Sequence, residues 1–474
     1  MVRTPVHRAL RIVLACVLAL LALVVGIVLA LGIPRNAAGM AAKGICSAAF
    51  VAHRPLAGLL QAEVLPASPV LALIGVSVQE FDQRVQARFA GLFERQAQWL
   101  PDRGCVLDVA AGPVRAAPPP VADTHQPWPA GEAALPPAAW DQRIDRTALQ
   151  RIVQQAFAGA GDPQAANARG IAVIHKGRAL VLQTAPGFGP ATALHGWSMT
   201  KTVLGMLSYK LARDNDFDLA TPVVNAFAGA REPDWVAAWR RDGRKAITVA
   251  DLLFMRDGLD SQEEYAPWGS VPRMLWGERD SAAYAASAAA QAPAGQRWRY
   301  LSQTANLLAA VDRARFASDA EYWSYPRRAL FEPIGARTAV LETDAAGNWV
   351  GSSYLWASVG DWARLGQLML QDGRWNDRQV LAPGWWALAS TPSLAQGEGS
   401  GYGAMSWRIG DAQAGRCRGS GVPPDTLAMN GHWGQVVAMV PSRDAVIVRL
   451  GWTFRSGQFD SCAFVAQVLA TLPH

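Results

Sequence analysis

The chain has 474 residues, of which 51% are hydrophobic, so it is long enough to bury a core of enzyme size. This composition excludes the disordered and fibrous classes. The formal net charge of +6 comes from basic residues that are scattered, without a run of five or more, so we expect no nucleic-acid partner. Only five of the 44 basic residues are lysines. Lysine, unlike arginine, can lose its proton when it is desolvated.

An apolar span lies near the N-terminus. Residues 12–34 are uncharged and lie between Arg11 and Arg35, and this length is enough to cross a bilayer. The run is longer than the ~7–15 apolar residues of a cleavable signal core, so we predict an uncleaved anchor, although Ala37-Ala38-Gly39 leaves cleavage open. A slight excess of arginines before the span favours a cytoplasmic N-terminus. Residues 1–37 are therefore predicted to be a cytoplasmic stub and anchor of a single-pass inner-membrane protein, with the rest facing the periplasm or exterior.

Cysteine usage agrees with export. Cys16 lies in the span and the other four cysteines lie beyond it, and an even number in an oxidising compartment suggests two disulfides. Three connectivities are possible, of which we predict the local one, Cys46–Cys105 and Cys417–Cys462. Four unpaired buried thiols are the alternative. No Cys/His spacing resembles a zinc site, and we expect no metal and no cofactor.

Three segments follow the span. Residues 38–112 alternate apolar and polar residues in places, which predicts a small exported segment containing β-structure. Residues 113–137 are too rich in proline for a helix or central strand and predict an extended linker. Residues 138–474 mix helical and strand patterns, so we predict one α+β domain whose sheet draws strands from both of its ends. The expected strands are 170–175, 179–182, 435–440 and 445–450, and the expected helices are 199–211 and 463–472.

The tetrad Ser198-Met199-Thr200-Lys201 can carry chemistry. At the start of a helix, Ser198 and Lys201 are one turn apart and their side chains can touch. A serine hydroxyl is a weak nucleophile until a base takes its proton, and a buried lysine can be neutral enough to do so. Free N–H groups at the start of a helix can also stabilise an oxyanion. The plain alternative is a solvent-facing Lys201 on an ordinary helix.

Two further motifs follow the Ser198–Lys201 tetrad along the chain. Tyr300-Leu301-Ser302 follows a Pro/Gly turn about a hundred residues on, and His432-Trp433-Gly434 introduces a C-terminal strand. With Ser-x-x-Lys first, Tyr-x-Ser second and His-x-Gly last, the chain resembles the β-lactamase-related serine hydrolases. That family includes class C β-lactamases, penicillin-binding D,D-peptidases, carboxylesterases and 6-aminohexanoate-dimer hydrolases. Residues 247–259 and 356–366 are similar to two further stretches of the family, and the resemblance covers residues 138–474.

The resemblance implies a β-lactamase/transpeptidase-like fold, with an antiparallel sheet flanked by helices and a mainly helical subdomain. It implies that Ser198 is the acylated nucleophile, that Lys201 is its base, and that Tyr300 helps to deliver a proton to the leaving group. The oxyanion hole would be the backbone N–H groups of Ser198 and Gln435. Ser302, His432, Trp433 and Gly434 would contact the substrate.

Two departures from the β-lactamase motifs bear on the substrate. Tyr-x-Asn is here Tyr-x-Ser, and Lys-Thr-Gly is here His432-Trp433-Gly434. A lysine at the last motif helps to hold the carboxylate of β-lactams, whereas a histidine with a pKa near 6.5 is largely neutral at neutral pH. These forms resemble the esterase and 6-aminohexanoate-dimer hydrolase branches, and Trp433 should crowd one side of the cleft. We therefore expect a small-molecule ester or amide substrate.

Two alternatives stay open. One is a D,D-peptidase, that is, a penicillin-binding protein, or a weak β-lactamase. The other is an inactive, membrane-tethered binding module, against which the presence of Ser198, Lys201 and Tyr300 together argues. The oligomeric state and the purpose of residues 38–112 are not predicted.

Overall fold

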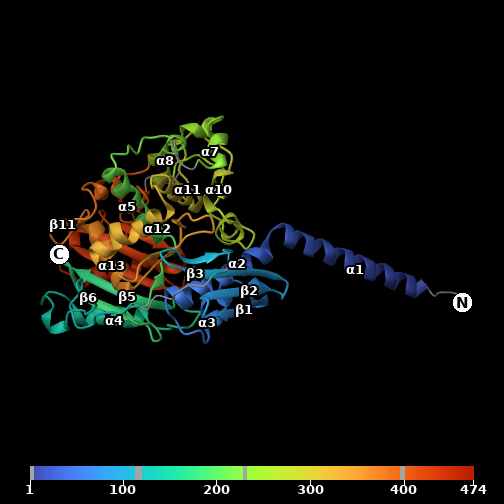
Figure 1. Ribbon diagram of the computed structural model, residues 1–474. Coiled ribbons are helices and arrows are strands. Elements are labelled where there is room, and N and C mark those ends of the chain that lie inside the picture. The colour runs from blue at the N-terminus through green and yellow to red at the C-terminus, as the bar shows by residue number, and fades with distance from the viewer. Residues whose placement is uncertain (1–4, 111, 113–119, 228–231, 395–400, 474) are drawn as a thin grey trace.

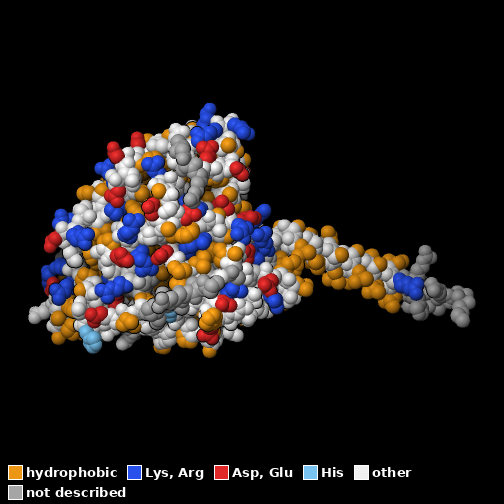
Figure 2. Space-filling view, viewed as in Figure 1, with side chains coloured by type: hydrophobic (Ala, Val, Ile, Leu, Met, Phe, Trp, Pro, Cys, Tyr) orange, Lys and Arg blue, Asp and Glu red, His pale blue; other side chains and the backbone are white. Residues whose placement is uncertain are grey.

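A computed structural model describes residues 5–110, 112, 120–227, 232–394 and 401–473. Helix α1 (Pro5–Ala30) projects away from the body of the protein (Figure 1). Its segment Ala9–Ala30 has a mean hydropathy of 3.3, none of it is buried, and Figure 2 shows its hydrophobic surface. This helix is a candidate membrane anchor or signal sequence, and it is the one such helix in the described part of the chain. Residues 1–4 of the predicted stub lie outside the described residues.

A five-stranded antiparallel sheet forms the centre of the body, in the order β12-β13-β14-β5-β6. Its strands come from both ends of the domain, as predicted. They are β5 (Ala168–His175), β6 (Arg178–Thr184), β12 (Leu427–Gly431), β13 (Gln435–Val440) and β14 (Ala445–Gly451).

Both faces of this sheet are buried, because alternate residues of each strand belong to two different cores. Ala172 and Ile174 pack with α5 (Met199–Asp214) and α13 (Val359–Leu370). Ile171 and Val173 pack with α4 (Arg146–Ala156) and α15 (Ser461–Ala470) on the other face (Figure 1). The predicted helices at 199–211 and 463–472 are therefore confirmed as α5 and α15.

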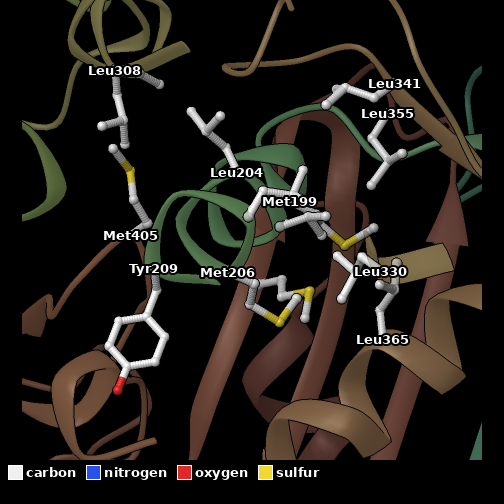
Figure 3. Close-up of a cluster of buried hydrophobic side chains, with 14 of the residues drawn as sticks. Met199, Leu204, Met206, Tyr209, Leu308, Leu330, Leu341, Leu355, Leu365 and Met405 are labelled. Atoms are coloured by element: carbon white, nitrogen blue, oxygen red, sulfur yellow. The ribbon is translucent and has the colours of Figure 1, made fainter. Parts of the chain in front are cut away.

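Most of helix α5 is buried. Figure 3 shows Met199, Leu204 and Met206 of α5 among side chains from several other elements, including Leu308 and Leu365. Short helices and two small sheets make up the long middle of the chain. These elements are α6 (Val223–Ala226), α7 (Asp234–Trp239), α8 (Val249–Leu253), α9 (Ser270–Pro272), α10 (Ser281–Ala286), α11 (Ser302–Arg313), α12 (Asp319–Pro326), α14 (Trp385–Ser390), β7 (Leu194–His195), β8 (Val340–Leu341), β9 (Leu355–Ala357), β10 (Arg374–Trp375) and β11 (Arg378–Gln379).

Residues 33–107 form what we call the N-terminal module. It consists of a helix, a short helix and a four-stranded antiparallel sheet in the order β1-β2-β3-β4. Its elements are α2 (Ile33–Cys46), α3 (Leu59–Glu63), β1 (Ile74–Gln79), β2 (Arg84–Phe89), β3 (Phe93–Leu100) and β4 (Gly104–Leu107). A disulfide joins Cys46 to Cys105 within the module, and a second joins Cys417 to Cys462. Both pairs are those predicted.

The N-terminal module shares one hydrophobic core with the rest of the body. Buried residues from α2 and β2 cluster with Trp276, Tyr354 and Trp452. A buried ion pair joins Lys43 to Glu342 at 3.1 Å, and the Glu342 carboxylate also accepts hydrogen bonds from the Ser47 hydroxyl and the Cys105 N–H. Buried charges are tolerated only when they are paired and hydrogen-bonded, so these contacts fix the module against the body.

The proline-rich stretch also packs against the body where it is described. Trp128 is 2% exposed and its indole N–H donates to the Gly360 carbonyl at 3.2 Å. The Arg364 guanidinium donates to the carbonyls of Pro129 and Gly131 at 2.9 and 2.7 Å. Residues 113–119 of the predicted linker lie outside the described residues. The predicted domain boundaries stay predictions.

Candidate active site

Ser198 and Lys201 lie at the start of α5 and touch. Ser198 immediately precedes the helix, and the Lys201 Nζ lies 2.8 Å from the Ser198 Oγ. The Lys201 amino group also donates to the Ser302 Oγ at 3.1 Å and to the Ser352 carbonyl at 3.0 Å. Lys201 is only 1% exposed, so the alternative of a solvent-facing lysine does not describe this helix.

Burial lowers the pKa of Lys201 to about 8, and the charge of Glu263 partly opposes this shift. No carboxylate among the described residues forms an ion pair with Lys201. Glu263 instead accepts hydrogen bonds from the Ser302 N–H at 2.6 Å and from the Ser302 Oγ at 2.7 Å. About one tenth of Lys201 is therefore neutral at pH 7, far more than for an exposed lysine, and a base for Ser198 requires this neutral form.

Two tyrosines lie beside Ser198, and the interaction with its hydroxyl partly opposes the rise in the pKa of each phenol. One is Tyr300, whose ring centroid is 4.8 Å from the Lys201 Nζ. The other is Tyr265, whose hydroxyl donates to the Glu263 carboxylate at 3.3 Å. Burial, followed by the charge of Glu263, raises the pKa of each phenol, so both stay protonated and can donate a proton or a hydrogen bond.

The two predicted oxyanion-hole donors lie on different elements, Ser198 at the start of α5 and Gln435 at the start of β13. Ser198 N–H is at the N-terminus of α5 and donates to no backbone carbonyl of the described residues. Gln435 begins β13, and its side-chain oxygen accepts the Gly451 N–H at 2.8 Å. A Cβ at Gly431 would collide with the carbonyl oxygen of Gly196, so glycine lets the end of β12 approach the chain that leads into Ser198.

Hydrogen bonds from Arg449 hold the turn between β12 and β13 in place. The buried Arg449 guanidinium donates to the carbonyls of Trp433 and Gly434 at 3.3 and 2.9 Å. Trp433 has a φ of 61° and Gly434 a φ of 84°, both in the left-handed region. The side chains of His432 and Trp433 in this turn both pack against Trp197, with centroid distances of 5.2 and 4.9 Å.

The His432 ring stacks on the Tyr265 ring, with centroids 4.3 Å apart and an interplanar angle of 7°. Burial lowers the pKa of His432 to about 4, so this side chain is neutral at neutral pH. Trp433 packs against Trp197 and Phe454, with centroid distances of 4.9 and 4.6 Å. The site therefore has a neutral aromatic side where β-lactamases carry a lysine.

A cavity of about 300 Å³, which we call the apolar pocket, adjoins this aromatic side. It is lined by Asn36, Ala37, Met40, Ala67, Ser68, Val70, Leu71, Trp197, Tyr265, Pro267, Pro272, Trp276, His432, Trp433 and Phe454. None of these residues is Asp, Glu, Lys or Arg. Seven of them belong to the N-terminal module, so the module forms part of the wall beside the candidate nucleophile.

The structure brings Ser198, Lys201, Tyr300 and Ser302 together and places the His432-Trp433-Gly434 turn beside them. Ser302 is fully buried between Lys201 and Glu263, a position that favours holding Lys201 over contacting substrate.

Sequence reasoning missed Glu263, Tyr265, Ser352 and the N-terminal wall of the pocket. Glu263 and Tyr265 lie in an irregular segment between α8 and α9 that carries no motif, and Ser352 contributes only a carbonyl. No local pattern could have indicated them.

Comparisons with known proteins show a family and a fold. A model of the beta-lactamase family matches residues 145–467. A solved structure assigned as a 6-aminohexanoate-dimer hydrolase from Bacillus anthracis is 19% identical with a TM-score of 0.54, covering 68% of this chain and 83% of that one. A penicillin-binding protein homologue from Caulobacter crescentus is 16% identical with a TM-score of 0.51, covering 72% and 99%. At these identities the similarity shows the fold. No curated protein matches the chain.

Proposed function

Because the chain belongs to the beta-lactamase family, whose model spans residues 145–467, we propose that it is a serine hydrolase that cleaves esters or simple amides through a Ser198 acyl-enzyme. The contact of 2.8 Å between the Lys201 Nζ and the Ser198 Oγ, in a buried position, is the observation that carries this proposal. A neutral lysine in that position accepts the hydroxyl proton as the oxygen attacks a carbonyl carbon.

The surrounding groups supply the remaining steps. The N–H groups of Ser198 and Gln435 hold the oxyanion that forms on the attacked carbonyl. When the bond to the leaving group breaks, Tyr300 gives that group a proton and recovers one from Lys201. Water then attacks the acyl-Ser198 ester and gives a proton to Lys201. As the acyl–Oγ bond breaks, the carboxylic acid leaves and Lys201 returns that proton to the Ser198 oxygen, which restores the hydroxyl. Glu263 and Ser302 position Lys201 throughout.

The apolar pocket beside the site favours uncharged groups, and the cation besides Lys201 that acts on Tyr300 is Arg416. His432 is neutral at neutral pH, and no lining residue of the apolar pocket carries a charge. A β-lactam or a D-alanyl peptide presents a carboxylate that such a surface does not compensate. Esters and simple amides without that carboxylate fit this surface better than the substrates of a β-lactamase or D,D-peptidase do.

The placement of α2 supports an uncleaved anchor. Cleavage after Ala38 would remove Ala37 from the apolar pocket and Asn36, whose side-chain N–H donates to the Pro267 carbonyl at 3.1 Å. The two disulfides suit an oxidising compartment, so the proposed location is the inner membrane with the body facing the periplasm or exterior. The mass of the chain extracted from membranes tests this: a product beginning at Gly39 would contradict it.

Labelling with a fluorophosphonate probe tests the proposed chemistry. The full-length wild type should be labelled, and Ser198→Ala should abolish labelling. Ser287→Ala, which removes an exposed hydroxyl directly after α10, is the matched control and should label normally. Undiminished labelling of Ser198→Ala would refute the assignment.

Two further measurements on the same protein distinguish the serine hydrolase from the two alternative functions. Capture of a fluorescent penicillin at Ser198, with poor ester turnover, would favour the D,D-peptidase or weak β-lactamase. Tight ligand binding without labelling or turnover would favour the inactive binding module.

A further inference from the structure

The apolar pocket has no assigned role in the chemistry, yet it adjoins the nucleophile. Trp197, which directly precedes Ser198 in the chain, lines the pocket, and so does Tyr265, whose hydroxyl donates to the Glu263 carboxylate that holds Ser302 beside Lys201. An apolar group in this pocket would therefore lie next to a carbonyl held at Ser198.

The pocket wall is made by two parts of the chain that are far apart in sequence. From the N-terminal module come α2 residues such as Met40 and the segment from Ala67 to Leu71. Facing them are the aromatic side chains of Trp276 and Trp433 from the body. Helix α2 packs closely against the body at this wall, because a Cβ at Gly39 would collide with the Trp276 carbonyl.

The side chains of the pocket wall favour an apolar ligand group over a charged one. Its two polar side chains from the N-terminal module are already engaged, since Asn36 donates to Pro267 and Ser68 accepts from the Val70 N–H. The remaining polar groups are uncharged: the His432 ring is neutral, the Tyr265 hydroxyl donates to Glu263, and the buried indole N–H of Trp197 has no hydrogen-bond partner among the described residues. A volume of about 300 Å³ is at the small end of ligand pockets, so it suits one short chain or ring.

Part of the pocket lining comes directly after the candidate membrane anchor in the chain. Helix α2 begins at Ile33, three residues after α1 ends at Ala30, so residues that line the pocket follow the candidate anchor almost directly. An amphiphile that partitions into a bilayer is the kind of molecule that this arrangement would meet.

We propose that the N-terminal module completes the substrate site, and that the apolar pocket binds the acyl or alkyl chain of an amphiphilic ester whose carbonyl is attacked by Ser198. The inference rests on the proposed serine hydrolase function. It gives residues 33–107 a role in specificity in addition to their packing.

Two series of substrates test it on full-length protein in lipid nanodiscs. One series is the p-nitrophenyl esters of acetate, butyrate and hexanoate, which lengthens the acyl side. The other is the acetates of ethanol, butanol and hexanol, which lengthens the alcohol side. In one of the two series, kcat/KM should rise by about fourfold for each methylene that enters the pocket.

Filling the pocket should remove that preference. Ala67→Phe places a large side chain on the wall, and the ratio of kcat/KM for the longest to the shortest ester of the responsive series should fall at least tenfold. Met40→Ala widens the same pocket and should shift the optimum to a longer chain. Ala57→Phe makes the same change as Ala67→Phe on an exposed loop of the module, and its ratio should match the wild type.

The outcomes distinguish this inference from the function on which it rests. Hydrolysis of the short esters and probe labelling, without dependence on chain length in either series, would overturn the pocket assignment alone. An unchanged ratio in Ala67→Phe, or an equal change in Ala57→Phe, would do the same. Absence of both labelling and hydrolysis in the wild type would overturn both proposals.

Discussion

Replacing Glu263 with glutamine should move the pH dependence of hydrolysis to lower pH. Burial lowers the pKa of Lys201 to about 8, and the negative charge of Glu263 is the opposing influence that keeps it from falling further. Lysine serves as the base in its neutral form, so kcat/KM should rise with pH through the pKa of Lys201 in the free enzyme. In the wild type the neutral fraction at pH 7 is about one tenth, and it approaches unity about two units higher.

Glu263→Gln removes the charge that raises the lysine pKa, so the rising limb should move toward lower pH. For each unit that the limb moves, the neutral fraction at pH 7 would increase up to about fivefold. The plateau rate is expected to fall, because one amide oxygen cannot replace the two carboxylate oxygens that accept the Ser302 N–H and Oγ. The position of the limb is therefore the readout, rather than the absolute rate.

The assay is the pH profile of kcat/KM for p-nitrophenyl acetate, corrected for spontaneous hydrolysis. Glu264→Gln is the matched control, since Glu264 is the exposed neighbour of Glu263 and makes no contact with Ser302 among the described residues. A limb that stays in place in Glu263→Gln, or that moves equally in Glu264→Gln, would refute the assignment of this limb to Lys201.

Tyr300→Phe should lower kcat by about 10²–10⁴-fold, because it removes the hydroxyl that gives a proton to the leaving group. Fluorophosphonate labelling should fall less, because fluoride is a better leaving group and needs less help from a proton donor. Equal losses in both assays would contradict a proton-donor role. Lys43→Met should lower the free energy of unfolding by about 3–5 kcal/mol because Glu342 loses its buried partner, and thermal melting at neutral pH measures this. Glu342→Gln in that background should recover part of the loss. A single variant as stable as the wild type would show that the pair does not hold the N-terminal module.

Local sequence rules accounted for the elements that depend on neighbouring residues. The helical spacing of Ser198 and Lys201 follows from 3.6 residues per turn, and the structure places the two side chains in contact. The strands at 435–440 and 445–450 follow from their alternation and the intervening turn, and they form β13 and β14. The two predicted disulfides are also present, one between α2 and β4 and the other between the segment before β12 and α15.

What the sequence by itself determined is the chemical type of the site: a serine one helical turn before a scarce lysine, with a tyrosine and a histidine motif in a recognisable order. Tertiary structure alone decided that Glu263 and Tyr265 join it and that residues 33–107 help to wall it. The physical reason is that those contacts link segments up to hundreds of residues apart, such as Asn36 and Pro267, and no local periodicity records which distant surfaces will share a core. The same packing buries Lys201 and so brings its pKa to about 8.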